Sequence, residues 1–118
     1  QTESFNNFVV GATYNGQEIT PNLNKLLKND TIYFNHFYST TGVGNTADAE
    51  FSALNGLYPN DIRECYRMYV DNTYNGLPWM FRENGYSALA FHGYVKTFWN
   101  RSEAYKNQGF SIIIQKKN

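Results

Sequence analysis

The stretch Thr41-Gly42-Val43-Gly44-Asn45-Thr46-Ala47-Asp48-Ala49-Glu50-Phe51 joins a glycine-rich turn to a predicted helix and sets a threonine at the helix start. Glycines let a backbone approach an anion closely, and the first N–H groups of a helix favour negative charge. Thr46 is therefore a candidate nucleophile toward a phosphate, although on this segment alone it can equally be a plain N-cap. A Walker phosphate loop is excluded, because no lysine precedes Thr46.

Helix and strand signals alternate on both sides of this stretch. Thr20-Pro21 has the pattern of an N-cap followed by a proline at the first helical position, and it starts a predicted helix that runs to Leu27. Further helices are predicted at 46–57, 76–84 and 101–107, strands at 31–38, 86–91 and 110–114, and an irregular polar loop at 60–75. This alternation predicts an α/β fold with a mostly parallel sheet flanked by helices. Sites are expected at the carboxyl ends of its strands, and Thr46 and His92 both follow predicted strands.

Composition limits the classes of function. The chain has 118 residues, 42% of them hydrophobic, which suits a single domain over residues 1–118. Ten basic residues balance ten acidic ones, so overall charge gives no argument for nucleic-acid binding. No apolar run approaches the ~20 residues of a membrane span. Cys65 is the only cysteine, which excludes an internal disulfide and any metal site built on paired cysteines.

Four other segments accompany the glycine-rich turn: Gln1-Thr2-Glu3-Ser4-Phe5, residues 15–26, Phe91-His92-Gly93 and Thr97-Phe98-Trp99-Asn100-Arg101. In this order and spacing they resemble the extracellular catalytic domain of lipoteichoic acid synthases. These are membrane-anchored phosphoglycerol transferases of the alkaline phosphatase and sulfatase superfamily. The resemblance covers residues 1–110 and implies an alkaline-phosphatase-like (sulfatase-like) fold on the outer face of a bacterial cell membrane.

The resemblance also implies a chemistry for Thr46. It makes Thr46 the nucleophile that takes glycerol phosphate from phosphatidylglycerol and passes it, through a phosphothreonine, to a growing lipoteichoic acid chain. Glu3 and Thr46 would share a divalent metal, Mn²⁺ in preference to Mg²⁺, which lowers the pKa of the hydroxyl and neutralises phosphate charge. Glu3 has an ordinary alternative as a solvated carboxylate. Asp48 and Glu50 are interpreted as compensation of the helix dipole.

His92, Trp99 and Arg101 match positions that line the glycerol phosphate pocket in this family. Arginine can hold a phosphate through two hydrogen bonds, histidine can donate to a phosphate or a hydroxyl, and tryptophan offers a wall for the glycerol. Each residue also has an ordinary interpretation: Trp99 in the core, Arg101 on a solvated helix and His92 as a satisfied histidine at a strand end. Their joint spacing favours the pocket.

Both chain ends bear on the expected activity. In the family, a strand precedes the glutamate equivalent to Glu3, and an Asp-His pair and a further histidine follow the matched region and bind the metal. None of these is in the sequence, so it predicts the N-terminal portion of a catalytic domain, truncated at both ends. On its own such a chain is expected to be inactive, soluble, without a membrane anchor, and inclined to self-associate through exposed sheet edges.

Three alternatives remain at this point. A sulfatase needs a formylglycine within a Cys-x-Pro-x-Arg type motif, but Cys65 is followed by Tyr66-Arg67-Met68. A related phosphoethanolamine transferase or phosphodiesterase would share the metal and the threonine, and the pocket residues argue for phosphoglycerol instead. The third alternative is a non-catalytic fragment, or binding module, that keeps the glycerol phosphate pocket without a complete set of metal ligands.

Overall fold

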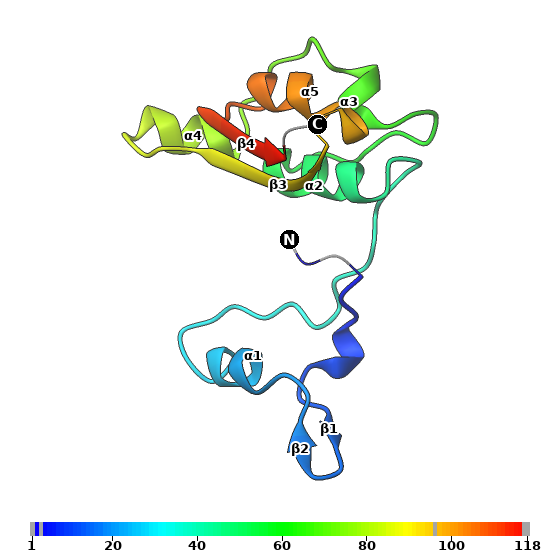
Figure 1. Ribbon diagram of the computed structural model, residues 1–118, viewed down its shortest axis with the longest axis vertical. Coiled ribbons are helices and arrows are strands. Elements are labelled where there is room, and N and C mark those ends of the chain that lie inside the picture. The colour runs from blue at the N-terminus through cyan, green and yellow to red at the C-terminus, as the bar shows by residue number, and fades with distance from the viewer. Residues whose placement is uncertain (1, 3, 96, 117–118) are drawn as a thin grey trace. The chain divides into compact units, whose positions relative to one another are not determined.

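The computed structural model describes residue 2, residues 4–95 and residues 97–116. The chain divides into two compact units, residues 1–38 and residues 39–118, each with an architecture of its own. Figure 1 labels the helices and strands of both units. The candidate residues Thr46, His92, Trp99 and Arg101 all belong to the second unit.

The first unit holds a short hairpin and a helix. Strands β1 (Thr13–Tyr14) and β2 (Gln17–Glu18) pair antiparallel, after a 3₁₀ turn η1 (Asn7–Val9), and helix α1 spans Pro21–Leu26. The helix predicted after Thr20-Pro21 is therefore confirmed. Buried Asn24 connects α1 to the rest of the unit: its Oδ1 accepts from the Gly11 amide and the Thr20 hydroxyl, each at 2.9 Å, and its Nδ2 donates to Glu18 at 3.1 Å.

The strand predicted at 31–38 is wrong. This segment has no regular secondary structure, and every one of its residues is exposed. Its β-branched and aromatic residues suggested a strand, but such propensity mostly reflects packing against neighbouring strands. No described strand pairs with it. Thr46 accordingly follows an irregular segment and not a strand.

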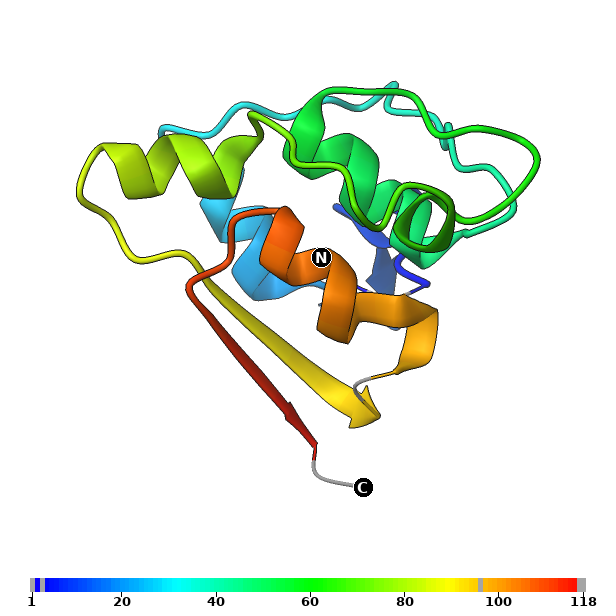
Figure 2. The same cartoon turned by 90° about the horizontal axis from the view of Figure 1, so that it is seen from above.

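The second unit contains the parallel sheet that the sequence predicts. Strand β3 spans Leu89–Val95 and β4 spans Ile112–Lys116, and they pair parallel with Ala90 opposite Ile113. Figure 2 shows the two strands side by side. The connection between them carries η2 (Phe98–Asn100) and α5 (Arg101–Asn107), the kind of crossover that a parallel pair requires. Both strands begin two or three residues later than predicted, so His92 lies inside β3 and not after it.

Helices α2 (Thr46–Asn55), α3 (Cys65–Met68) and α5 pack around one core with β3, and α4 (Leu77–Glu83) contacts α2. The core consists of buried residues from four of these elements: Ala47, Phe51, Cys65, Tyr66, Ala90, Ala104 and Tyr105. The predicted helices at 46–57, 76–84 and 101–107 are confirmed. The predicted loop at 60–75 contains α3, which buries Cys65 and Tyr66 at the centre of the core.

Trp79 attaches α4 to the end of α5. Its indole Nε1 donates to the Asn107 carbonyl at 3.2 Å, and the Arg82 guanidinium lies 4.5 Å from the centre of its ring. Gly109 has a φ of +97°, and a Cβ there would come within 2.7 Å of the Trp79 ring. The close contact and the left-handed backbone both require glycine at this turn.

The sheet leaves an apolar surface uncovered. Alternate residues of the two strands are exposed by 42% to 68%, namely Leu89, Phe91, Ile112 and Ile114. Ala90, between two of them, is buried against the helices. We call these four exposed residues the open sheet face. Within the described residues, no helix is long and apolar enough to cross a membrane.

Candidate functional site

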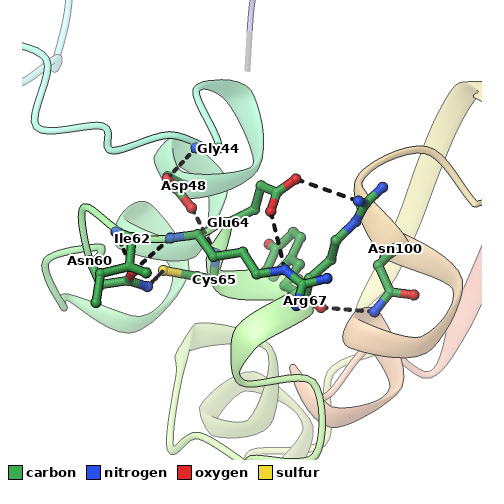
Figure 3. Close-up of polar contacts among 10 residues, drawn as sticks. Gly44, Asp48, Asn60, Ile62, Glu64, Cys65, Arg67 and Asn100 are labelled. Carbon is green, nitrogen blue, oxygen red and sulfur yellow. Dashed lines mark hydrogen bonds and ion pairs between the residues drawn. The ribbon is translucent and has the colours of Figure 1, made fainter.

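The turn before Thr46 is held by a buried carboxylate. Thr46 is the first residue of α2 and is half-buried, whereas Asp48 is completely buried. Asp48 accepts a hydrogen bond from the Gly44 amide at 2.7 Å and another from the Cys65 amide at 3.0 Å (Figure 3). The two carboxylate oxygens therefore join the turn to the first residue of α3. The interpretation of Asp48 as simple dipole compensation is wrong, because its carboxylate points into the interior.

Steric contact explains the two glycines of this turn. A Cβ at Gly44 would lie 2.5 Å from the Asp48 carboxylate, and a Cβ at Gly42 would collide with the Asn60 carbonyl oxygen. The Asn60 side chain in turn accepts from the amides of Ile62 and Arg63, at 2.8 and 3.0 Å, which orders the loop that leads into α3 (Figure 3). Glycine at 42 and 44 is thus needed so that the turn can pack closely on this loop.

Glu50 and Arg101 form a buried ion pair between α2 and α5. Arg101 is 1% exposed, and its Nε and Nη2 donate to the two oxygens of Glu50 at 3.1 and 2.5 Å. The Tyr105 hydroxyl also donates to Glu50, at 2.9 Å. The dipole interpretation of Glu50 is therefore wrong as well, and the alternative of Arg101 on a solvated helix face is excluded. Residues four apart share a helix face, so Thr46 lies on the same side of α2 as Glu50.

Burial and the charges of this pair shift the pKa values of the groups around it. Burial acts to lower the pKa of Arg101, but the hydrogen bonds and charge of Glu50 outweigh it and raise that pKa. Burial, followed by the charge of Glu50, raises the pKa of Tyr66 and of Tyr105. Both phenols are consequently neutral, and each has a hydroxyl proton to donate.

His92 and Trp99 lie in the same unit as this pair. His92 is half-buried in β3, and its Nε2 is buried with no hydrogen-bond partner among the described residues. Burial lowers the pKa of His92, and the Arg101 charge lowers it further. Trp99 is half-buried and packs against the core with a φ of +57°, immediately before Asn100 at +58°. The Asn100 side chain donates to the Tyr66 carbonyl at 2.9 Å, which anchors this left-handed pair to α3 (Figure 3).

The lowered pKa of His92 predicts that the fold loses stability in mild acid. In the unfolded chain the imidazole has its ordinary pKa of about 6.5, so just below this pH the unfolded state binds more protons than the folded state. Stability therefore rises with pH in this window. We expect the urea midpoint to fall between about pH 7.5 and about pH 5.5, and to fall less in His92→Gln.

The matched control for this measurement is His36→Gln, which changes the other histidine, on an exposed segment. It should keep the slope of stability against pH that the wild-type chain shows. Equal slopes for wild type and His92→Gln would contradict the assignment to His92.

The described residues do not form a metal site on their own. No group of three or more His, Cys, Asp or Glu side chains among them is placed to hold a cation. Glu3 lies outside the described residues. Thr46 and Glu3 together are also fewer than the roughly six oxygen ligands that Mg²⁺ or Mn²⁺ takes.

Comparisons with known proteins agree with this architecture. The family model described as Sulfatase matches residues 1–118. The chain is 41% identical over 108 residues to lipoteichoic acid synthase 2 of Bacillus subtilis. It is 42% identical over 110 residues to the lipoteichoic acid synthase of Staphylococcus aureus. Each match covers 91% of this chain but only 17% of the relative, so the chain spans about a sixth of their length.

A solved structure matches as well. The crystal structure of the lipoteichoic acid synthase LtaP from Listeria monocytogenes superimposes with a TM-score of 0.86 at 34% identity. The match covers 95% of this chain and 27% of that one. The predicted α/β class and the resemblance to the lipoteichoic acid synthases are thereby confirmed.

Proposed function

Because this chain belongs to the sulfatase family, we propose that it supplies the nucleophile and the phosphate pocket of a phosphoglycerol transferase. The relatives to which it is 41–42% identical are lipoteichoic acid synthases. The observation that carries the proposal is the position of Thr46, at the first residue of α2 behind a turn that Asp48 holds. A formylglycine sulfatase is disfavoured, because buried Cys65 lacks the motif for that modification.

The proposed reaction has two displacements at phosphorus. The Thr46 oxygen forms a bond to the phosphorus of phosphatidylglycerol while the bond to the diacylglycerol oxygen breaks, and diacylglycerol leaves with a proton. The terminal hydroxyl of the lipoteichoic acid chain then attacks the phosphothreonine, gives up its proton and releases the Thr46 hydroxyl. Arg101 and His92 would hold the phosphate, and Trp99 would pack against the glycerol.

A divalent cation, Mn²⁺ or Mg²⁺, is the cofactor that this proposal implies, with Glu3 and Thr46 among its ligands. Such an ion neutralises phosphate charge when bound. The described residues offer no complete site for it, so further ligands would have to come from a longer protein. The single-domain organisation over 1–118 and the place of action, the outer face of a bacterial cell membrane, remain part of this proposal.

Substitution of the nucleophile tests the reaction. In the longer protein that carries these residues, we expect Thr46→Ala to abolish release of diacylglycerol from a fluorescent phosphatidylglycerol analogue, and the isolated 118-residue chain to show no release. Thr73→Ala, at an exposed threonine between α3 and α4, is the matched control and should keep full activity. Activity that survives Thr46→Ala would eliminate Thr46 as the nucleophile.

A glycerol phosphate binding module without turnover is the second candidate. It is favoured by the ion pair of Arg101 with Glu50, which is already formed in this chain. Binding of glycerol phosphate by the isolated chain, without release of diacylglycerol by any longer form, would support this second candidate over the transferase.

Self-association through exposed sheet edges is part of this proposal, and the open sheet face offers a second surface for it. Its four apolar side chains lie on adjacent strands, and monomeric proteins rarely expose large contiguous apolar patches. We expect the sedimentation coefficient of the chain to rise with concentration, and Phe91→Lys to reduce this rise. Lys25→Glu, at an exposed residue of α1, is the control. A sedimentation coefficient that stays constant with concentration would contradict the prediction.

A further inference from the structure

The two edges of the Arg101 guanidinium differ in their hydrogen bonds: one edge pairs with a carboxylate, and the other does not. The Nε–Nη2 edge faces the Glu50 carboxylate, at 3.1 and 2.5 Å. The Tyr105 hydroxyl supports this arrangement, since it lies 3.0 Å from Nε and donates to the same Glu50 oxygen that Nε contacts. On the other side, Nη1 makes one long contact of 3.4 Å with the Phe98 carbonyl.

A guanidinium can bind two anions at once, because it has five N–H groups in a rigid plane. With Glu50 on the Nε–Nη2 edge, the Nη1–Nη2 edge holds the two parallel donors that a phosphate accepts. Because the Arg101 side chain is only 2% exposed, a phosphate would reach this edge in place of the Phe98 carbonyl at Nη1. A phosphate bound there would not displace Glu50. The ion pair with Glu50 and a phosphate would thus use different edges of Arg101, as long as Glu50 keeps the guanidinium in this orientation.

Two further donors belong to the same cluster. The Tyr66 hydroxyl and His92 Nε2 are both buried, and neither has a hydrogen-bond partner among the described residues. Tyr66 is 1% exposed, its ring lies 5.9 Å from that of Tyr105, and its hydroxyl is within the electrostatic reach of Glu50 and Arg101. A neutral phenol, a neutral imidazole and a guanidinium edge can all donate to an acceptor with several oxygens.

We infer that Glu50 is a positioning residue: it binds the Nε–Nη2 edge of Arg101, together with Tyr105, and so turns the Nη1–Nη2 edge toward the phosphate of the substrate. This inference rests on the proposed function, in which Arg101 binds glycerol phosphate. It assigns a role to a carboxylate that itself touches no substrate. Tyr105 supports the same orientation through its single hydroxyl.

A purely electrostatic role and a positioning role of Glu50 predict opposite effects of Glu50→Gln on phosphate affinity. Glu50 is negative and lies beside the proposed phosphate site, so removal of its charge alone would strengthen phosphate binding. If Glu50 positions Arg101, the weaker amide pairing releases the guanidinium, and phosphate binding weakens instead. The sign of the change in affinity therefore separates the two roles.

The experiment is a titration of glycerol phosphate into the folded 118-residue chain by calorimetry, with glycerol as the phosphate-free control ligand. We expect Glu50→Gln to weaken binding about tenfold, the effect of losing one charge-assisted hydrogen bond, and Tyr105→Phe about threefold. The matched control is Glu103→Gln, which removes an equal charge from an exposed ion pair with Lys106 on α5 and should leave affinity unchanged.

A spectroscopic signal follows Arg101 directly. The ¹H–¹⁵N resonance of its Nε–H group should shift and exchange faster with water in Glu50→Gln than in Glu103→Gln. This resonance reports the hydrogen bond of one side chain, so a general loss of stability in a folded variant does not reproduce the change. If Glu50→Gln does not fold, Tyr105→Phe tests the inference by the same two measurements.

The outcomes are distinguishable. Equal or tighter binding by Glu50→Gln, while Arg101→Lys weakens binding, would overturn the positioning role and leave the proposed pocket intact. No binding by the wild-type chain, or binding that Arg101→Lys leaves unchanged, would overturn the pocket and the inference with it. An unchanged Nε–H resonance in Glu50→Gln would overturn the positioning role alone.

Discussion

Arg101→Met should lower the free energy of unfolding by about 3–5 kcal/mol, because removing one member of a buried ion pair leaves the other charge without compensation. The Glu50 carboxylate would lose both donors of Arg101 while its side chain is only 17% exposed. A domain of this size has a total stability of about 5–15 kcal/mol, so the expected loss is a large fraction of the free energy of unfolding. Urea denaturation followed by far-UV circular dichroism measures the change.

Two further variants test whether the burial of the ion pair causes the loss of stability in Arg101→Met. Lys106→Met removes a cation from the same helix, but its pair with Glu103 is 62% and 57% exposed, so the expected loss is about 0–1 kcal/mol. The double variant Glu50→Leu/Arg101→Met removes both charges and should recover part of the loss. Equal losses for Arg101→Met and Lys106→Met would show that burial of the pair contributes nothing.

Asp48→Ala should lower the free energy of unfolding by about 2–6 kcal/mol, since two backbone amides lose their acceptor at a cost of about 1–3 kcal/mol each. The two amides are those of Gly44 and Cys65, and Asp48 itself is fully buried. Asp48→Asn keeps one carbonyl acceptor and should lie between wild type and Asp48→Ala. Chemical denaturation gives the free energies, and hydrogen exchange locates the effect at the two amides.

The control for this second prediction is Asp61→Ala, at an exposed acidic residue of the next loop. It should change stability by less than about 0.5 kcal/mol, as surface substitutions usually do. Protection of the Gly44 and Cys65 amides that persists in Asp48→Ala would mean that the carboxylate does not hold the turn before Thr46.

The parts of the fold that the sequence predicted are those with local signals. The glycine-rich turn before Thr46 and the Thr20-Pro21 pair are contained within a few residues, and both helices start where these signals stand. The start of α5 at Arg101 was equally predictable. Local chemistry is enough in such cases, because capping and turn preferences depend on neighbouring residues.

The errors have non-local causes. Residues 31–38 have strand composition but no described partner strand, and composition carries no information about pairing. The polarity around Cys65 suggested a loop, yet Asp48, seventeen positions earlier, accepts from its amide and helps to bury α3. A carboxylate in a first helical turn ordinarily compensates the dipole. Only the fold reveals that Glu50 faces an arginine fifty-one residues away.

The candidate site, like the fold, was predictable from the sequence only in part. The resemblance identified Thr46, His92, Trp99 and Arg101 by their spacing, and their roles remain proposals. It gave no sign of Tyr105, whose hydroxyl adjoins the same cluster from α5. An arginine followed four residues later by a tyrosine on one helix face is the local signal that could have indicated a supported guanidinium.

Because Trp79 attaches α4, the intrinsic tryptophan fluorescence of this protein can report on that attachment. Trp79 and Trp99 are the only two tryptophans of the sequence. Trp79 stacks with Arg82 and bonds to the end of α5. Trp99 lies elsewhere, beside Phe98 and against the core. Replacing either one with phenylalanine leaves a single indole emitter. Fluorescence can then follow the detachment of α4 and the opening of the Arg101 region separately, without an added label.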